Sequence, residues 1–174
     1  MNPVSVADTY TKKTELVLPN DTNNLGNLMG GILLKWMDVN AAISAMRATR
    51  RTVVTVSVDF VEFRHSIPQG SVVILESKVT RTFNSSMEVK VDVSYEILQT
   101  GEFHHSNSAF YSFVAVDQSG RSIPVNPVIP ETHEEKELYE SALERREMRL
   151  LLSGRMKLED SQIVKKRLNE NRLF

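Results

Sequence analysis

The sequence predicts an α+β fold in which a five-stranded antiparallel sheet wraps around one central helix, followed by a C-terminal helical extension. The segment 30–49 is apolar around nearly its whole circumference, which is typical of a helix covered on most sides. One segment before this helix and four after it are strand candidates separated by turns, and apolar and polar residues alternate clearly at residues 52–64 and 87–98. Such strands present one apolar face, and wrapping that face around the helix buries both.

Each expected strand ends at turn-forming residues. The first is short, and a loop rich in Asn, Asp, Thr and Gly then leads into the helix. The last four are each about a dozen residues long, which exceeds the usual ~5–6 residues. A long edge strand invites pairing with a second copy, so we expect a dimer with a shared sheet. The strands are expected at residues 12–18, 52–64, 71–83, 87–98 and 102–117, and residues 1–10 are expected to be held loosely.

The strand at residues 52–64 alternates, so its residues can be assigned to two faces of the sheet. Thr55 falls on the more polar face. The expected faces hold Val54, Val56, Val58 and Phe60 on one side, and Thr55, Ser57 and Asp59 on the other.

A change of composition after residue 120 predicts two parts, a domain at residues 11–120 and a proline-rich arm with helices at residues 121–174. Thr132 and Glu135 fit a capping box, which predicts the start of a charged amphipathic helix over residues 133–152. A second short helix is expected within residues 159–171. Both helices are too polar to form a core of their own, so we expect them on the outside or in subunit contacts.

Composition and charge exclude several classes of function. The 174 residues are 41% hydrophobic and 25% charged, as is typical of one globular domain. The formal net charge of −1 gives no reason to expect a nucleic acid or an anionic membrane as partner. The absence of cysteine excludes disulfides and thiolate chemistry. Polar residues interrupt the apolar helix and no secretory signal is evident, so we expect a cytoplasmic protein.

Motifs for nucleophilic triads, phosphate loops and metal sites are missing from the sequence. There is no G-x-S-x-G and no G-x-G-x-x-G. His104 and His105 are adjacent in a strand and therefore point to opposite faces. We expect no metal site, because none of the histidines has the spacing of a ligand pair. The histidines are His65, His104, His105 and His133.

The residues that could perform chemistry gather in the segment 20–48. Asp38 is the one carboxylate of the apolar helix, and a charge among apolar residues is costly unless it is used. Gly30 and Gly31 place bare N–H groups at the helix start, where the dipole favours negative charge. Asn23 offers an amide donor. Each also has a structural explanation. Asp38 could simply reach solvent, the two glycines could allow tight packing of the turn, and Asn23 could be a turn former. Together they predict a general base and a set of donors that polarise a carbonyl group, which is sufficient for water to attack an activated acyl group.

Residues 21–38, DTNNLGNLMGGILLKWMD, resemble the signature of hotdog-fold acyl-CoA thioesterases, roughly D-x-N-x-x-G-x-x-x-G-G-x-x-L-x-x-M-D. The subgroup is that of the bacterial short-chain to broad-range enzymes and the brain-type acyl-CoA hydrolases. Residues 53–63, 110–117 and 127–136 are similar to the same family but less specific. The resemblance implies a continuous sheet across a dimer, often within a homohexamer built as a trimer of dimers. It also implies hydrolysis of acyl-CoA to a free fatty acid and CoA, with no cofactor besides the CoA of the substrate.

The resemblance also implies roles for individual residues. Asn23 would polarise the thioester carbonyl or orient the water, and Asp38 of the other subunit would act as general base or nucleophile. Thr55 would hold Asp38 or the water, and an N–H of Gly30 or Gly31 would stabilise the oxyanion. The residues implied in CoA binding are Arg81, Phe83, Asn84, Ser85 and Ser86, with Arg64 as a phosphate contact. Arg64 lies one position earlier than the arginine of the family motif F-x-R-P-V, which puts its role in question.

Two other functions on the same fold have to be weighed. A hydroxyacyl dehydratase needs a histidine near the helix start, and residues 20–40 contain none. A non-catalytic acyl-CoA-binding or sensing protein remains the alternative, which the carboxylate of Asp38 speaks against. The sequence leaves open the acyl chain length, the choice between a general base and a covalent anhydride, the choice between hexamer and tetramer, and the role of residues 155–174.

Overall fold

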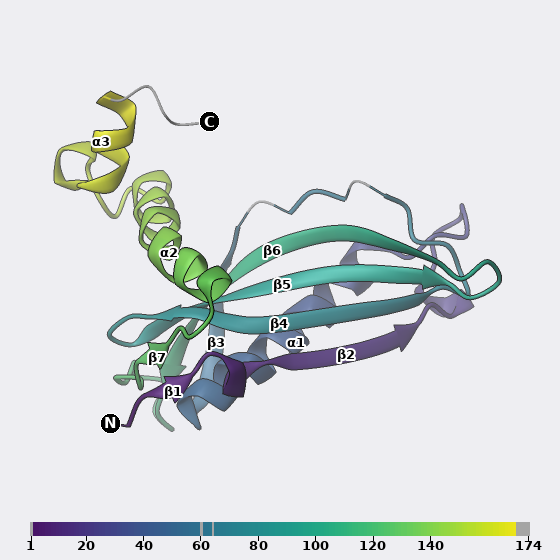
Figure 1. Cartoon of the computed structure of the whole chain (residues 1–174), viewed down its shortest axis with the longest axis horizontal. Coiled ribbons are helices and arrows are strands. Elements are labelled where there is room, and N and C mark those ends of the chain that lie inside the picture. Colours follow the sequence, from purple (N-terminus) through teal and green to yellow (C-terminus); the bar gives the residue numbers. More distant parts are fainter. Residues whose placement is uncertain (1, 60, 64, 170–174) are drawn as a thin grey trace. The chain divides into compact units, whose positions relative to one another are not determined.

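The computed structural model describes residues 2–59, 61–63 and 65–169, and the chain divides into two compact units, Met1–Ile129 and Pro130–Phe174. In the first unit a curved antiparallel sheet lies against the helix α1, Gly30–Thr49 (Figure 1). The helix has the bounds expected from its apolar residues. The predicted α+β arrangement of one helix and five antiparallel strands is therefore confirmed.

The five strands follow the order β2-β4-β5-β6-β3 across the sheet, so β2 and β3 form its two edges. Each of the five expected strands is present, within a few residues of its expected ends. The exception is β3, which ends at Val58, whereas the alternation had suggested a strand to residue 64. Phe60 and Arg64 lie outside the described residues. The strands are β2 Thr11–Leu16, β3 Thr52–Val58, β4 Val72–Thr82, β5 Ser86–Ile97 and β6 Glu102–Val116.

The core lies between α1 and the concave face of the sheet. Small residues of α1, Ala41, Ala45 and Ala48, are fully buried and allow the strands to approach the helix closely. A polar seam fixes the helix against β4, because Asn40 Nδ2 and Ser44 Oγ both bond Ser77 Oγ, at 2.9 and 2.7 Å. Buried hydrogen bonds of this kind favour one register of packing, although Asn40 Oδ1 has no partner among the described residues.

One stripe of α1 is not covered by the rest of the chain. Val39 and Met46, seven residues apart and hence on one helix face, are 42% and 41% exposed. The expectation that the helix is covered on most sides is therefore met only in part by a single copy. A large apolar stripe left in water is a candidate contact surface.

A β-bulge in β3 changes which residues share a face. Before it, Thr55 pairs with Phe113; after it, Ser57 pairs with Ser112 and Val58 with Tyr111. The extra residue, Val56, breaks the alternation, so Val58 lies on the same face as Thr55. The expected grouping of Val58 with Val54 is therefore wrong, because a bulge depends on the partner strand and leaves no mark on the alternation.

The N-terminal residues are ordered, contrary to expectation. The strand β1, Val4–Ser5, pairs in parallel with β7, Val128–Ile129, more than a hundred residues later. A short 3-10 turn, Ala7–Thr9, follows. Thr9 is completely buried, and its hydroxyl accepts a bond from the Val79 N–H at 3.0 Å. These contacts tie residues 4–9 to the first unit.

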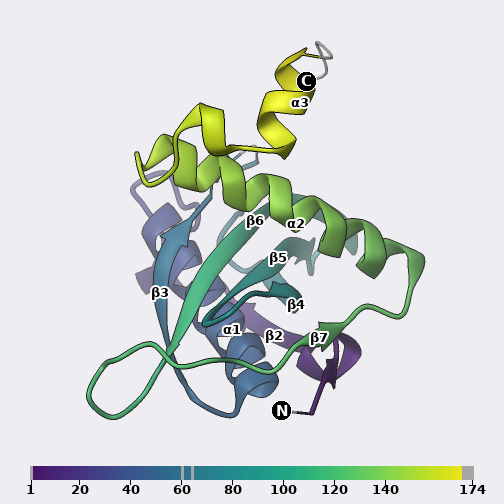
Figure 2. The same cartoon turned by 90° about the vertical axis from the view of Figure 1, so that its left-hand side faces the viewer.

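The second unit consists of α2, His133–Leu152, and α3, Ile163–Asn169, with a 3-10 turn, Leu158–Asp160, in the connection between them (Figure 2). The predicted capping box is present, since Glu135 N–H donates to Thr132 Oγ1 while the Glu135 carboxylate accepts from the Thr132 N–H. Among the described residues, none of the helices combines the length and hydropathy needed to cross a lipid bilayer.

Candidate active site

Asp38 and Thr55 meet at the edge of the sheet. Asp38 is half-buried on α1, and Thr55 lies on β3 with its side chain on the face that turns toward the helix. The Thr55 hydroxyl donates a hydrogen bond of 2.7 Å to Asp38 Oδ1. A hydroxyl that donates to an ionised carboxylate makes a charge-assisted bond, which orients the acid and stabilises its charged form.

The start of α1 presents unused backbone donors. The N-cap residue Met29 makes no side-chain cap, and within the described residues the N–H groups of Gly30 and Gly31 have no acceptor. Such donors lie at the positive end of the helix dipole and favour an anion or an oxyanion. The arrangement can therefore stabilise negative charge that develops on a carbonyl oxygen.

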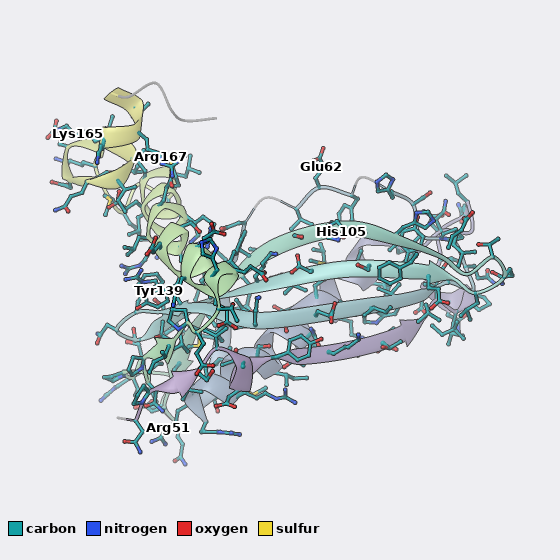
Figure 3. All side chains as sticks on the ribbon, in the orientation of Figure 1. Arg51, Glu62, His105, Tyr139, Lys165 and Arg167 are labelled. Atoms are coloured by element: carbon teal, nitrogen blue, oxygen red, sulfur yellow. The ribbon has the colours of Figure 1, made fainter. Side chains whose placement is uncertain are left out.

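The two glycines differ in what surrounds them. A Cβ on Gly30 would lie 3.3 Å from the ring of Phe63, so Gly30 is needed for this close packing. A Cβ on Gly31 would meet nothing within 4 Å. Phe63 belongs to the short segment 61–63, from which the Glu62 side chain points away from the sheet (Figure 3). The packing explanation thus applies to Gly30, whereas Gly31 faces open space.

Asn23 uses its amide oxygen to shape the loop before α1. Its Oδ1 accepts bonds from the N–H groups of Leu25 and Asn27, at 2.9 and 3.3 Å. The loop closes onto the helix start through a bond from Met29 N–H to Asp21 O, at 2.8 Å. The Nδ2 group has no acceptor among the described residues. Asn23 is therefore a turn former through its oxygen and an available donor through its nitrogen.

One chain does not bring all of these groups together. Gly30 and Asp38 are eight residues apart on α1, which is about 12 Å along the helix axis. Asp38 lies with Thr55, while Asn23 lies in the loop that leads to Gly30. A single carbonyl group therefore cannot contact both ends of this span within one chain.

The residues implied in CoA binding form the turn between β4 and β5. The guanidinium of Arg81 lies over the Phe83 ring, 5.8 Å from its centroid. The carbonyl oxygens of Asn84 and Ser85 accept from Val125 and Ala115, at 2.9 and 3.0 Å, which fixes the turn. Arg64 lies outside the described residues. The pairing register places Thr55, Phe113, Met87 and Thr82 in one row across the sheet.

That row shows where the β4–β5 turn lies relative to Asp38. Because Thr82 immediately precedes the turn, the turn lies at the same level of the sheet as Thr55. Three strand spacings of about 4.8 Å separate them, roughly 14 Å in all. The turn and the Asp38–Thr55 pair are therefore at the same end of the sheet and well apart along its width.

Two inward-facing polar residues of β6 were missed from the sequence. Tyr111 is 1% exposed, and among the described residues its hydroxyl has no hydrogen-bond partner. Burial raises the pKa of Tyr111 to about 12, and the negative charge of Asp38 adds to the effect. Asn107 Oδ1 is likewise buried without a partner, while its Nδ2 lies 3.7 Å from the sulfur of Met37. The available signal was the presence of polar residues at inward positions of an alternating strand.

The histidines contribute no metal centre in the described part of the chain. No group of three or more His, Cys, Asp or Glu side chains is close enough there to hold an ion. His104 stacks on Tyr95, with ring centroids 5.0 Å apart. His105, which Figure 3 labels, lies 3.4 Å from the Ser108 hydroxyl.

Comparison with known sequences points to one family. Residues 25–100 match the family model described as "Thioesterase superfamily". YkhA of Bacillus subtilis, named an uncharacterized acyl-CoA thioester hydrolase, is 47% identical over 133 residues, which cover 76% of this chain and 77% of that protein. The human cytosolic acyl coenzyme A thioester hydrolase is 35% identical over 140 residues, 79% of this chain. The chain spans only 37% of the length of this human relative.

Solved structures agree in fold. A hexameric acyl-CoA thioesterase superposes with a TM-score of 0.84 at 43% identity, covering 88% of this chain and 98% of the other. The acyl-CoA hydrolase of Staphylococcus aureus, solved with butyryl coenzyme A and coenzyme A, gives a TM-score of 0.80 at 32% identity, covering 88% and 96%. That protein has also been solved with single alanine replacements of an asparagine, an aspartate and a threonine.

Proposed function

Because this chain belongs to the hotdog-fold acyl-CoA thioesterase family, we propose that it hydrolyses acyl-CoA to a free fatty acid and CoA. The observation that carries the proposal is the bond from the Thr55 hydroxyl to Asp38. It holds one half-buried carboxylate at the edge of the sheet and leaves Oδ2 available, which supports a role for Asp38 as a base acting on water. A protein that merely bound acyl-CoA would need no acid held in this way.

In the proposed reaction Asp38 takes a proton from water, whose oxygen attacks the thioester carbon. The resulting tetrahedral intermediate carries its negative charge on the former carbonyl oxygen. The C–S bond then breaks, and the departing CoA sulfur receives a proton. The same carboxylate could attack the carbon itself and form an anhydride that water later opens. Both routes require the acid to be ionised and close to the carbonyl.

The oxyanion is placed at the start of α1. The N–H groups of Gly30 and Gly31, which have no acceptor among the described residues, and the Nδ2 group of Asn23 supply donors where the loop meets the helix. The open space beside Gly31 leaves room for the acyl carbonyl to approach. Loss of one such donor typically costs about 10²–10³ in kcat.

Two subunits would form each active site. The ~12 Å between Gly30 and Asp38 along one helix excludes their joint action on one carbonyl. On the edge strand β3, Val54, Val56 and Val58 are 44%, 51% and 42% exposed, although edge strands normally avoid such apolar surface. Pairing of β3 with a second copy would cover it and bring the acid of one chain to the donors of another. The hexameric assembly of a solved relative supports a trimer of such dimers.

CoA is assigned to the β4–β5 turn. Arg81, stacked on Phe83, offers a cation for a phosphate, and the side chains of Asn84, Ser85 and Ser86 offer hydrogen bonds. A relative solved with butyryl coenzyme A supports CoA esters as the substrate class. The name of the human relative supports a cytoplasmic location.

The replaced residues of the Staphylococcus aureus relative support the assignment of roles. The asparagine, the aspartate and the threonine that were changed to alanine in that protein are separated by 15 and 17 positions. Asn23, Asp38 and Thr55 are the same residue types with the same separations.

The replacement Asp38→Asn tests the proposal directly. The amide oxygen can still accept the Thr55 bond, so the change removes the base and little else. We expect release of free thiol from acyl-CoA to fall by roughly 10²–10⁴, the usual effect of losing an acid–base group. The measurement is thiol release over a series of acyl chain lengths, with the oligomer checked by gel filtration.

Asp8, which is exposed and lies in the 3-10 turn Ala7–Thr9, provides the matched control Asp8→Asn, which should leave turnover unchanged. Near-native turnover of Asp38→Asn would show that Asp38 is structural. Absence of turnover in the unmodified protein for every chain length would instead favour the binding or sensing function.

A further inference from the structure

The hydroxyl of Tyr111 is a buried donor for which the proposed reaction has no role yet. The side chain is 1% exposed, and no described residue bonds its oxygen. Buried hydroxyls nearly always have a partner, because an unmade bond is costly in a protein interior. The missing partner is therefore expected to be a water or a group that arrives with the substrate.

The position of Tyr111 places it beside the proposed base. On β6 it is paired with Val58 of β3, and Phe113, two residues on, is paired with Thr55. The rings of Tyr111 and Phe113 stack, with centroids 6.3 Å apart and planes inclined by 18°. Tyr111 thus lies next to the residue row that contains the Asp38–Thr55 pair, on the face of β6 that meets α1.

Asp38 is the anion that acts on Tyr111. The negative charge of Asp38 contributes to raising the pKa of the Tyr111 hydroxyl, after burial. A raised pKa keeps the hydroxyl protonated across the neutral range, so it is available as a donor. Asp38 in turn has a second carboxylate oxygen, Oδ2, to which the Thr55 hydroxyl does not donate.

Other charged groups around this site do not compete for the hydroxyl. Among the described residues of β5 and β6, the titratable side chains on the face of Tyr111 are Tyr95, His104 and Glu102. His104 stacks on Tyr95 and lies 3.7 Å from the Glu102 carboxylate, toward the other end of β6. On β2, at the opposite sheet edge, Lys13 and Glu15 pair with each other at 2.7 Å. Lys35 on α1 and Glu62 are exposed to solvent.

We propose that Tyr111 is a positioning residue for Asp38, to which its hydroxyl donates through one bridging water at Oδ2. Thr55 and Tyr111 then hold the carboxylate from two sides and leave its remaining lone pairs for the water that attacks the thioester. This inference rests on the proposed function, because it assigns Tyr111 a role only if Asp38 is the base. Among the described side chains, Thr55 is the one that donates directly to this acid, so a second donor would have to act through water.

The replacement Tyr111→Phe removes one oxygen and retains the ring and its stacking on Phe113. We expect kcat to fall roughly tenfold, as for a lost hydrogen bond to a charged group, with KM nearly unchanged. The acid limb of the profile of kcat/KM against pH should move to higher pH, because the ionised form of the acid has lost a hydrogen-bond donor. The assay is thiol release between pH 4 and pH 9.

Tyr95→Phe is the matched control, since it makes the same change at a buried tyrosine of the same sheet whose ring stacks on His104. It should change neither kcat nor the acid limb. Circular dichroism melting of both variants separates loss of fold from loss of positioning.

A second measurement combines Tyr111→Phe with Asp38→Asn. If Tyr111 acts through Asp38, adding Tyr111→Phe to the Asp38→Asn variant causes no further loss of kcat. Unchanged kcat and an unmoved acid limb in Tyr111→Phe would overturn the proposal. A loss of kcat with a lower melting temperature and no movement of the acid limb of the pH profile would also overturn it. Failure of the proposed function is recognised separately, by turnover that survives Asp38→Asn alone.

Discussion

Asn23 has two separable roles within one side chain. Its oxygen accepts from the Leu25 and Asn27 N–H groups and holds the loop, while its nitrogen is the donor assigned to the thioester carbonyl. An alanine replacement would remove both and could not tell the two roles apart. A variant that keeps the oxygen is therefore more informative.

We predict that Asn23→Asp keeps the loop and loses the reaction. The carboxylate oxygen can accept both loop bonds, but it has no N–H to donate and adds negative charge where an oxyanion would form. Turnover should fall by about 10², as for one lost oxyanion donor. The melting temperature should stay within a degree or two of the unmodified protein, because its loop bonds remain.

Asn23→Ala is the companion variant, which should lose activity and some stability. Comparison of thiol release and melting temperature across the two variants assigns each role. Retention of activity in Asn23→Asp would mean that Asn23 is a turn former alone.

At the scale of elements, one carboxylate of α2 caps the start of α3, and an ion pair of 2.8 Å between Arg167 and Glu144 also joins the two helices. Glu147 Oε2 accepts bonds from Ser161 Oγ at 2.6 Å and from the N–H groups of Ile163 and Val164, at 3.0 and 3.2 Å. It thereby caps the first turn of a helix too short to be stable alone. Burial alone would raise the pKa of Glu147, but these hydrogen bonds outweigh it and lower the pKa.

The direction of that shift determines the dependence on pH. A carboxyl whose pKa is lower in the folded chain contributes its stabilisation above the ordinary pKa of Glu, about 4.3. The contribution disappears as pH falls through the lowered value in the folded state. The α3 cap is therefore complete at neutral pH and is lost in acid.

We predict that Glu147→Ala releases α3 while α2 persists. Amide hydrogen exchange at residues 163 and 164 should accelerate at pH 7 by roughly tenfold or more, because their acceptor is gone. The matched control Glu140→Ala removes an exposed acid from the same helix and should leave those amides protected. Equal protection in Glu147→Ala and the unmodified chain would contradict the capping role.

For the whole molecule, the proposed function implies that one chain holds two incomplete halves of a site. The acid and its threonine lie at the β3 edge, and the donors lie at the start of α1. In a two-fold dimer each chain can supply the acid to one site and the donors to the other. Such sharing makes a strong prediction about mixed assemblies.

We predict that two inactive variants restore activity when they assemble together. In a dimer of one Asp38→Asn chain and one Asn23→Ala chain, one site carries both defects and the other is intact. Random assembly makes roughly half of the dimers mixed, so about a quarter of full activity should return. Thiol release is measured after joint refolding or joint expression of the two variants.

Each variant refolded alone is the control and should stay at its own low level. If acid and donors of one chain served the same site, mixing would restore nothing, because every site would keep its defect. The size of the recovery thus distinguishes shared from private active sites.

Local patterns were sufficient for most elements. The apolar residues of α1 and the capping box of α2 predicted both helices at their observed bounds. Turn-forming residues, with alternation at residues 52–64 and 87–98, predicted all five strands, although β3 ends earlier than expected. The 21–38 signature selected Asp38, Asn23 and the glycines, and pointed to Thr55 as a partner for Asp38. The contact between Asp38 and Thr55 is present, while the catalytic roles stay predictions.

The sequence by itself determined the elements, the family and the residue types of the site, because periodicity and short motifs are properties of neighbouring residues. Tertiary structure alone decided the bulge at Val56, the pairing of β1 with β7 and the unpartnered hydroxyl of Tyr111. Each of these depends on which distant strand lies alongside and in what register. That choice is made by packing across the whole domain, and no local pattern records it.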